Sequence, residues 1–170
     1  MTSVLKSSSW SVAELNMKTP PEMRDLACRL LAYEDTTDKF SDLTESATLR
    51  VYEKLRRSLS AFAGVAGFQS IASRALTLAR TEVAGLSAVR ISPDGYLQGF
   101  EDSKYEIETD RMNKDESGEY AASEAGIVLI ARVLCLLHIF LGEALTTSLL
   151  RDAWPGAAFY DHNSGNGRKA

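Results

Sequence analysis

Hydrophobic side chains recur at intervals of three and four residues along three stretches of the chain, a spacing typical of helices that bury one face. The pattern predicts helices over residues 19–34, 43–63 and 68–84, the first with Thr19 as its N-cap. Two glycines in the segment 64–67 separate the second helix from the third, and glycine lowers helix stability. We therefore expect a bend or a very close helix contact there. The buried stripe of the second helix is expected to consist of Ala47, Val51, Leu55, Leu59 and Phe62.

A short β-hairpin is expected over residues 88–100. Residues 88–91 alternate apolar and polar side chains, Ser92-Pro93-Asp94-Gly95 has the composition of a β-turn, and residues 96–100 can return as the second strand. The acidic, charge-dense stretch over residues 101–118 is predicted to be largely a loop.

The most apolar segment lies between Ile127 and Leu141, where Arg132 and His138 are the polar side chains. At about 100° per residue these two lie roughly 120° apart around a helix, so the helix has no polar face. Such a helix is buried in protein or spans a membrane. A spanning helix needs about 20 apolar residues, and Arg132 near the bilayer centre would cost about 2.5–3.5 kcal/mol. We therefore expect a buried central helix, with a membrane anchor over residues 121–141 as an alternative.

Together these elements predict a mainly α, single-domain helical bundle around a central apolar helix, with one short hairpin. A length of 170 residues suits one domain. We expect a flexible N-terminal arm over residues 1–18, a helical domain over residues 19–160 and a disordered tail, rich in Asn, Gly and Ser, over residues 161–170. No secretory signal is expected, because the first ten residues lack an apolar run.

Composition and charge narrow the functional classes. A net charge of -4 and a pI near 5.3 argue against a nucleic-acid-binding protein, which ordinarily presents a basic face. Cys28 and Cys135 stand in apolar helical patterns, so each is expected to be a small buried hydrophobe rather than half of a disulfide. A reducing compartment, the cytoplasm, is the expected location.

No group of residues predicts catalysis, a metal ion or a cofactor. His138 and Cys135 lie on neighbouring positions of one helix and supply two ligands at most, whereas a structural zinc site needs four. His162 lies in the predicted tail, where a general base would lack fixed geometry. The segment 64–67 has two glycines but no lysine after it, so it does not meet the phosphate-loop fingerprint.

Arginines supply one set of candidate binding residues. Arg74 and Arg80 on the third helix, together with Arg132, could clamp an anion in a pocket between helices, as a nucleotide-binding regulator would require. The same helices could instead present a basic surface to an acidic partner. Its residues would be Lys54, Arg56, Arg57, Arg74 and Arg80.

Arg132 also suggests a homodimer. Burying an unpaired guanidinium is very unfavourable, and Glu143 lies on nearly the same azimuth if one helix continues that far, although roughly 16 Å away along the axis. Two antiparallel copies crossing near residue 137 or 138 would bring Arg132 of one close to Glu143 of the other. Three amphipathic helices would also wrap the central helix incompletely, and two-fold pairing is the commonest closed assembly. The candidate interface residues are Arg132, His138 and Glu143.

Four short stretches of sequence stand out between residues 25 and 154, namely Ala27–Glu34, Glu53–Arg57, Gly64–Phe68, and Gly142-Glu143-Ala144-Leu145 followed by Trp154-Pro155. With these segments the chain resembles a family of small helical bacterial proteins with no assigned activity, over residues 25–154. The resemblance implies a bacterial cytoplasmic protein and no catalytic residue.

The leading interpretation is a non-enzymatic protein-interaction or regulatory module that is homodimeric and needs no cofactor. Two alternatives stay open. One is a small-molecule or nucleotide-binding regulator with an arginine-lined pocket, and the other is a membrane-associated protein anchored by residues 121–141.

Overall fold

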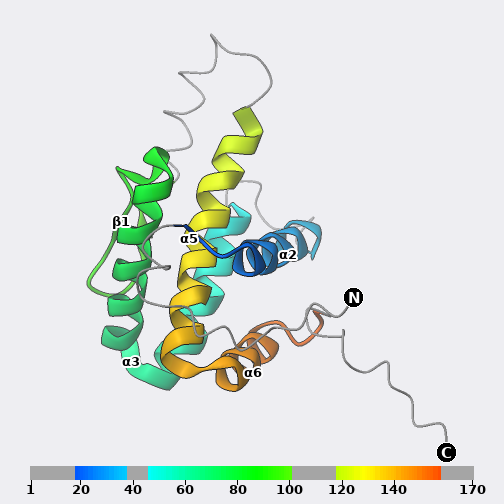
Figure 1. Ribbon diagram of the computed structural model, residues 1–170. Helices are drawn as coiled ribbons and strands as arrows, with labels where there is room; N and C mark the ends of the chain where they lie inside the picture. The colour runs from blue at the N-terminus through cyan, green and yellow to red at the C-terminus, as the bar shows by residue number, and fades with distance from the viewer. Residues whose placement is uncertain (1–17, 38–45, 101–117, 158–170) are drawn as a thin grey trace, which may run out of the picture.

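The computed structural model describes residues 18–37, 46–100 and 118–157, with side chains from residue 124 onward in the last range. The described residues form four helices and one two-stranded sheet, so the predicted mainly α fold with a short hairpin is confirmed (Figure 1). The predicted N-terminal arm and C-terminal tail lie almost entirely outside these ranges. The elements are α2 (Pro21–Thr37), α3 (Ala47–Glu82), the 3₁₀ turn η1 (Ala84–Leu86), β1 (Arg90–Ile91), β2 (Leu97–Gln98), α5 (Gly118–Leu141) and α6 (Glu143–Ala153).

Helix α5 is the central element of the bundle. In Figure 1 it runs through the middle of the molecule, with α2 crossing it and the two arms of α3 beside it. Every residue from 128 to 137 is buried, Arg132 included, as expected for a helix without a polar face. The stretch Glu124–Leu141 is long and apolar enough to cross a membrane, but 67% of it is buried inside the protein. The helix is thus covered on all sides in its middle, and from residue 124 onward the large apolar side chains that remain exposed are Ile139 and Phe140 at its C-terminal end.

Gly64 divides α3 into two arms. Its backbone has φ 78° and ψ 164°, a region that glycine reaches without steric penalty. A side chain added at Gly64 would meet no atom within 4 Å, so this glycine serves the bend rather than a close helix contact. The bend also accounts for an error in the predicted stripe. Leu55 and Leu59 are buried, but Phe62 is 54% exposed because the helix turns away from the core next to it.

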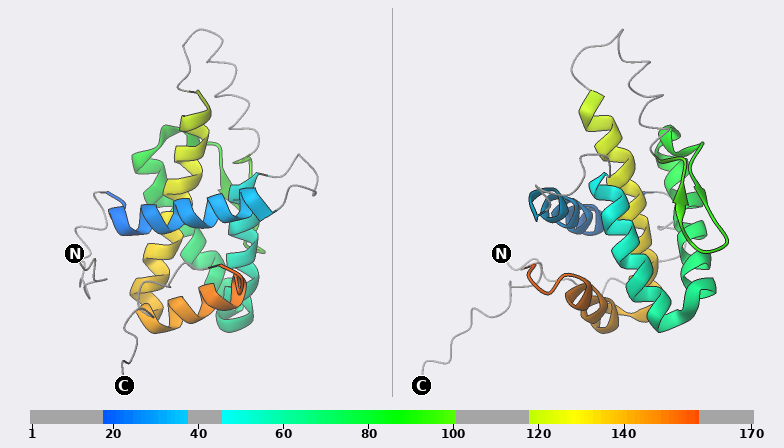
Figure 2. Two further views of the ribbon diagram at one scale, coloured as in Figure 1. Left: turned by 90° about the vertical axis from the view of Figure 1, so that its right-hand side faces the viewer. Right: turned by 180° about the vertical axis from the view of Figure 1, so that it is seen from behind.

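Gly142 produces a second bend with nearly the same backbone conformation, φ 81° and ψ 168°. It ends α5 at Leu141, and α6 begins at Glu143 in a new direction (Figure 1). The expectation that the helix of Arg132 continues through Glu143 is therefore wrong. The two bends lie at the same end of the bundle, as the views in Figure 2 also show.

The hairpin lies against α3. Strands β1 and β2 pair antiparallel, which confirms the prediction for residues 88–100. The Tyr52 hydroxyl donates to the carbonyl of Gly95 at 2.7 Å, and the guanidinium of Arg56 stacks 4.1 Å from the ring centroid of Tyr96. These contacts hold the β-turn on the first arm of α3.

A very close helix contact is made by a glycine that the sequence pattern did not single out for this role. A side chain added at Gly126 of α5 would stand 2.2 Å from the hydroxyl oxygen of Thr48 on α3. Since real Cβ atoms do not approach that closely, the absence of a side chain at Gly126 sets the separation of these two helices.

Candidate functional site

The fully buried Arg132 has its counter-charge within the chain. Its Nε donates to Oε1 of Glu82 at 2.6 Å, and its Nη2 forms an ion pair with the same oxygen. Glu82 also accepts hydrogen bonds from the backbone N–H of Thr19 at 3.1 Å and from its hydroxyl at 2.6 Å. Thr19 therefore binds the end of α3 instead of capping α2 as predicted. Because Arg132 is 0% exposed, this charge network holds helices together rather than facing solvent.

The protonation of Glu82 follows from the same contacts. Partial burial works to raise the pKa of Glu82, but the hydrogen bonds from Thr19 and Arg132 outweigh it. The pKa of this carboxyl group consequently lies below its ordinary value of 4.5. Glu82 is thus held as a carboxylate opposite the guanidinium at neutral pH.

The ion pair removes the reason for placing Arg132 at an interface. Arg132 is buried against Glu82, and Glu143 lies exposed on α6 beyond the bend at Gly142. His138 is partly buried near the end of α5. The structure therefore does not bring Arg132, His138 and Glu143 together on one surface, and the antiparallel pairing of Arg132 with Glu143 loses its geometric basis.

The buried carboxylate of Glu34 joins α2 to α3 and to the end of α6. Trp154 donates its indole N–H to Oε1 of Glu34 at 2.6 Å, and Lys54 forms an ion pair with the same oxygen. The Nε of Arg50 lies 3.8 Å from the other carboxylate oxygen. The ammonium of Lys54 also stands 5.7 Å from the centroid of the Trp154 ring. Both Glu34 and Trp154 are buried, so these polar partners satisfy groups that water cannot reach.

The arginines of the predicted anion clamp do not converge. Arg80 donates its Nε to the carbonyl of Leu86 at 3.1 Å and its Nη2 to the carbonyl of Val89, which ties the chain after α3 back to that helix. Arg74 is exposed and lies six residues earlier, about 120° away around the helix. Arg132 is paired with Glu82, so in the described part of the chain the three guanidinium groups have different surroundings and do not converge on one another.

The predicted basic surface is largely balanced by acidic side chains of the same chain. Glu53 accepts two hydrogen bonds from Arg56, at 2.8 and 2.6 Å, and one from Arg57 at 3.1 Å. The hydrogen bonds from Arg56 lower the pKa of Glu53, and those from Arg57 add to the effect. Lys54 pairs with Glu34. The acidic stretch that was expected to face this surface lies almost wholly outside the described residues.

The two cysteines differ in their exposure to solvent. Cys135 is buried as predicted, whereas Cys28 is exposed, because it follows Ala27 on α2 and points away from the core face. Burial raises the pKa of Cys135 to about 11 and also raises the pKa of Cys28. Both groups are thus thiols at neutral pH, which is not the state of a nucleophilic cysteine. Within residues 18–37, 46–100 and 118–157, no three His, Cys, Asp or Glu side chains are grouped as metal ligands would be.

Exposed apolar side chains gather at one end of the bundle. Phe62 and Val65 flank the bend at Gly64, and Ile139 and Phe140 stand at the end of α5. The bend of α3 and the end of α5 both lie at the lower end of the molecule in Figures 1 and 2. Phe140 is 65% exposed, the highest fraction among them. We call these four residues the apolar end. Sequence reasoning missed this surface because helical spacing places Phe62, Ile139 and Phe140 in a core and Val65 lies in the predicted bend, and only the two glycine bends indicate where the packing stops.

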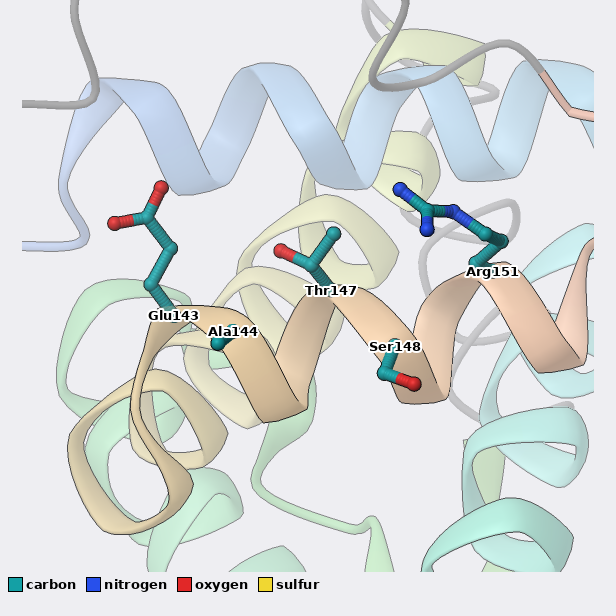
Figure 3. Close-up of a pocket in the computed structure, with 5 residues that line it drawn as sticks. All are labelled: Glu143, Ala144, Thr147, Ser148 and Arg151. Atoms are coloured by element: carbon teal, nitrogen blue, oxygen red, sulfur yellow. The ribbon is translucent and has the colours of Figure 1, made fainter.

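An open hollow of about 470 Å³ lies along α6. It is lined by Glu143, Ala144, Thr147, Ser148 and Arg151. Figure 3 shows Glu143, Thr147 and Arg151 along one side of α6, directed toward α2. All five lining residues belong to one helix, so a small molecule in this hollow would stay largely exposed to solvent, unlike a ligand in an ordinary binding pocket.

Comparison with known proteins adds no functional assignment. No protein-family model, curated protein or solved structure matches this chain. The resemblance to small helical bacterial proteins therefore stays a prediction, as does the cytoplasmic location.

Proposed function

We propose that this chain is a non-enzymatic protein-interaction module that acts as a homodimer, with the second copy covering the apolar end. The observation that carries the proposal is the exposure of Phe62, Val65, Ile139 and Phe140 at one end of a bundle whose middle is fully covered. Exposed apolar side chains that gather in one place are typical of interaction surfaces.

A second copy is the favoured occupant of the apolar end. Apolar surface is complementary to itself, and the same patch on both subunits is what a two-fold interface requires.

The interior supports an interaction role rather than catalysis. Arg132 and Glu34 are buried charged residues, and their contacts bridge α2, α3, α5 and the end of α6. Each is thereby used to hold the helices in place. The arginines that a ligand-binding regulator would need are divided among separate contacts.

The test is the oligomeric state of the full chain, measured by sedimentation velocity over a range of concentrations. We expect a dimer for the wild type and a monomer for the double variant I139S/F140S, because serine removes the apolar surface that a second copy would bury. The matched control is Y96S, which replaces an aromatic side chain of similar exposure in the hairpin and should leave the dimer unchanged. Circular dichroism verifies that each variant is folded.

Two outcomes would overturn the proposal. One is a monomeric wild type at every concentration. The other is co-flotation of the wild type with phospholipid vesicles that I139S/F140S abolishes while the oligomeric state stays the same, since the apolar end would then serve a membrane surface.

A further inference from the structure

Helix α6 is attached to the rest of the bundle at its two ends. It follows α5 through Gly142, and its C-cap residue Trp154 donates the indole N–H to Glu34 at 2.6 Å. Between these points α6 packs on α3 and α5, with Thr146 and Leu150 buried. In the described part of the chain, the bond from Trp154 to Glu34 is the one side-chain hydrogen bond that links residues 143–154 to another helix.

The bend at Gly142 depends on the backbone of this residue alone. Its φ of 81° and ψ of 168° lie in a region that is essentially restricted to glycine. Gly142 is exposed, and a side chain added there would meet no atom within 4 Å, so no surrounding group holds the bend in place. As N-cap it offers no side-chain acceptor to the first N–H groups of α6, which have no partner within their own helix.

The same sequence is compatible with one continuous helix. Residues 119–153 contain no proline, and glycine adopts helical angles at a modest cost. With Gly142 helical, α6 continues α5, and its first N–H groups pair with the carbonyl groups of residues 139–141. The bent and the straight chain thus differ at a single residue.

Two features of the bent state oppose the docking of α6. Thr146 is 5% exposed, and its buried hydroxyl has no hydrogen-bond partner among the described residues. A buried hydroxyl without a partner loses its hydration without compensation. In addition, the flank of α6 that faces α2 borders the open hollow of about 470 Å³, so this flank adds little packing (Figure 3).

We infer that α6 is a hinged helix. It closes over the core when Gly142 is bent and Trp154 is bound to Glu34, and it swings out as a continuation of α5 when that bond breaks. Leu150 and Trp154 belong to the main core, so release uncovers apolar surface at the end of the bundle where α5 stops. The released state therefore offers a second copy a larger apolar end, a consequence that rests on the proposed function.

A distance between α2 and α6 reports the two states. Spin labels are attached to Cys28, which is exposed on α2, and to S148C, at an exposed position of α6. Cys135 is buried and stays unlabelled in the folded protein. Labelled chains are diluted with excess unlabelled chains, so that double electron–electron resonance measures distances within one chain. We expect a major population at the docked distance and a minor one at a longer distance.

G142A should shift this balance toward the released state. Alanine is disfavoured in the bent conformation and favoured in a helix, so the ratio of long to docked distances should rise roughly tenfold or more. The matched control is G64A, because Gly64 has nearly the same backbone conformation and also no atom within 4 Å of an added side chain. Since Gly64 joins the arms of α3, G64A should leave the ratio unchanged. Circular dichroism verifies that both variants are folded.

Two further variants should act in opposite directions and do not alter the hinge. W154F removes the donor to Glu34 and should raise the long-distance population severalfold. T146V replaces the unpaired buried hydroxyl with a methyl group and should lower it. A change of opposite sign separates the docking of α6 from a general loss of stability.

The outcomes distinguish this inference from the proposed function. Folded G142A and W154F proteins that keep the docked distance alone would overturn the hinged helix. If G142A releases α6, it should also dimerise severalfold more tightly in sedimentation velocity, and unchanged dimerisation would overturn the enlargement of the apolar end. A wild type that is monomeric at every concentration, with the distance changes as expected, would overturn the proposed function and leave the hinged helix standing.

Discussion

Arg132 and Glu82 form an ion pair between the middle of α5 and the last residue of α3, with Nε 2.6 Å from Oε1 and the guanidinium fully buried. This pair explains how a helix as apolar as α5 can contain an arginine. The carboxylate comes from another helix 50 positions away in sequence, and Thr19 completes its hydrogen bonds. The charge therefore contributes to the arrangement of the helices.

The first prediction concerns this pair. E82Q leaves the buried guanidinium of Arg132 without a counter-charge, so the free energy of unfolding should fall by about 3–5 kcal/mol. Urea unfolding followed by circular dichroism measures the loss. The double variant E82L/R132M removes both charges and should recover most of it. An E82Q protein as stable as the wild type would show that the pair contributes little.

The second prediction concerns acid stability. The pKa of Glu82 is lowered in the folded state, so its stabilisation is fully present above its ordinary value of 4.5. As pH falls through the folded pKa, the unfolded state takes up the proton first and stability is lost. Glu53, whose pKa is also lowered, adds to the effect. Unfolding measured between about pH 6 and pH 2 should show a shallower decline for E82Q than for the wild type.

The third prediction concerns Trp154 and Glu34. W154F keeps an aromatic ring in the core but removes the indole N–H that donates to Glu34 at 2.6 Å. A buried carboxylate that loses a donor should cost about 1–3 kcal/mol of folding free energy. The double variant W154F/E34Q should lose less than the sum of the two single variants, because the residues share one contact. Additive losses in urea unfolding would argue against that contact.

The fourth prediction concerns the α3–α5 contact. G126A places a methyl group 2.2 Å from the hydroxyl oxygen of Thr48, so the helices must separate and stability should fall by about 1–3 kcal/mol. T48A removes that oxygen, and G126A/T48A should recover part of the loss. G67A is the comparison, because its new methyl group would stand 3.1 Å from the single methyl carbon of Ala63. Equal melting temperatures for G126A and G67A would contradict the close contact.

The fifth prediction concerns the two thiols. Cys28 is exposed and should react in the native protein with a thiol reagent such as DTNB, slowly because its pKa is raised. Cys135 is buried, with its pKa raised to about 11, and should react only after unfolding. C28S should abolish the native reaction, and C135S should leave it unchanged.

Much of the fold follows from local sequence patterns. The positions of α2, of the two arms of α3 and of the apolar part of α5, together with the bend near Gly64 and the hairpin at residues 88–100, could be predicted, because the spacing of apolar residues, glycine conformation and turn composition act over a few residues. The separate helix α6 was not predicted. The apolar run from 127 to 141 also required a covered helix. The sequence determined these features without reference to distant parts of the chain.

Tertiary structure decided the rest. Whether Arg132 faced a second copy or a residue of its own chain depended on Glu82, which no local pattern connects to α5. Phe62 and Phe140 have the helical spacing of core residues, yet they are exposed because Gly64 and Gly142 turn the chain where covering helices end. A periodic pattern reports which face of a helix is apolar. It carries no information on which element covers that face, since burial is a property of contacts between segments that are far apart in sequence.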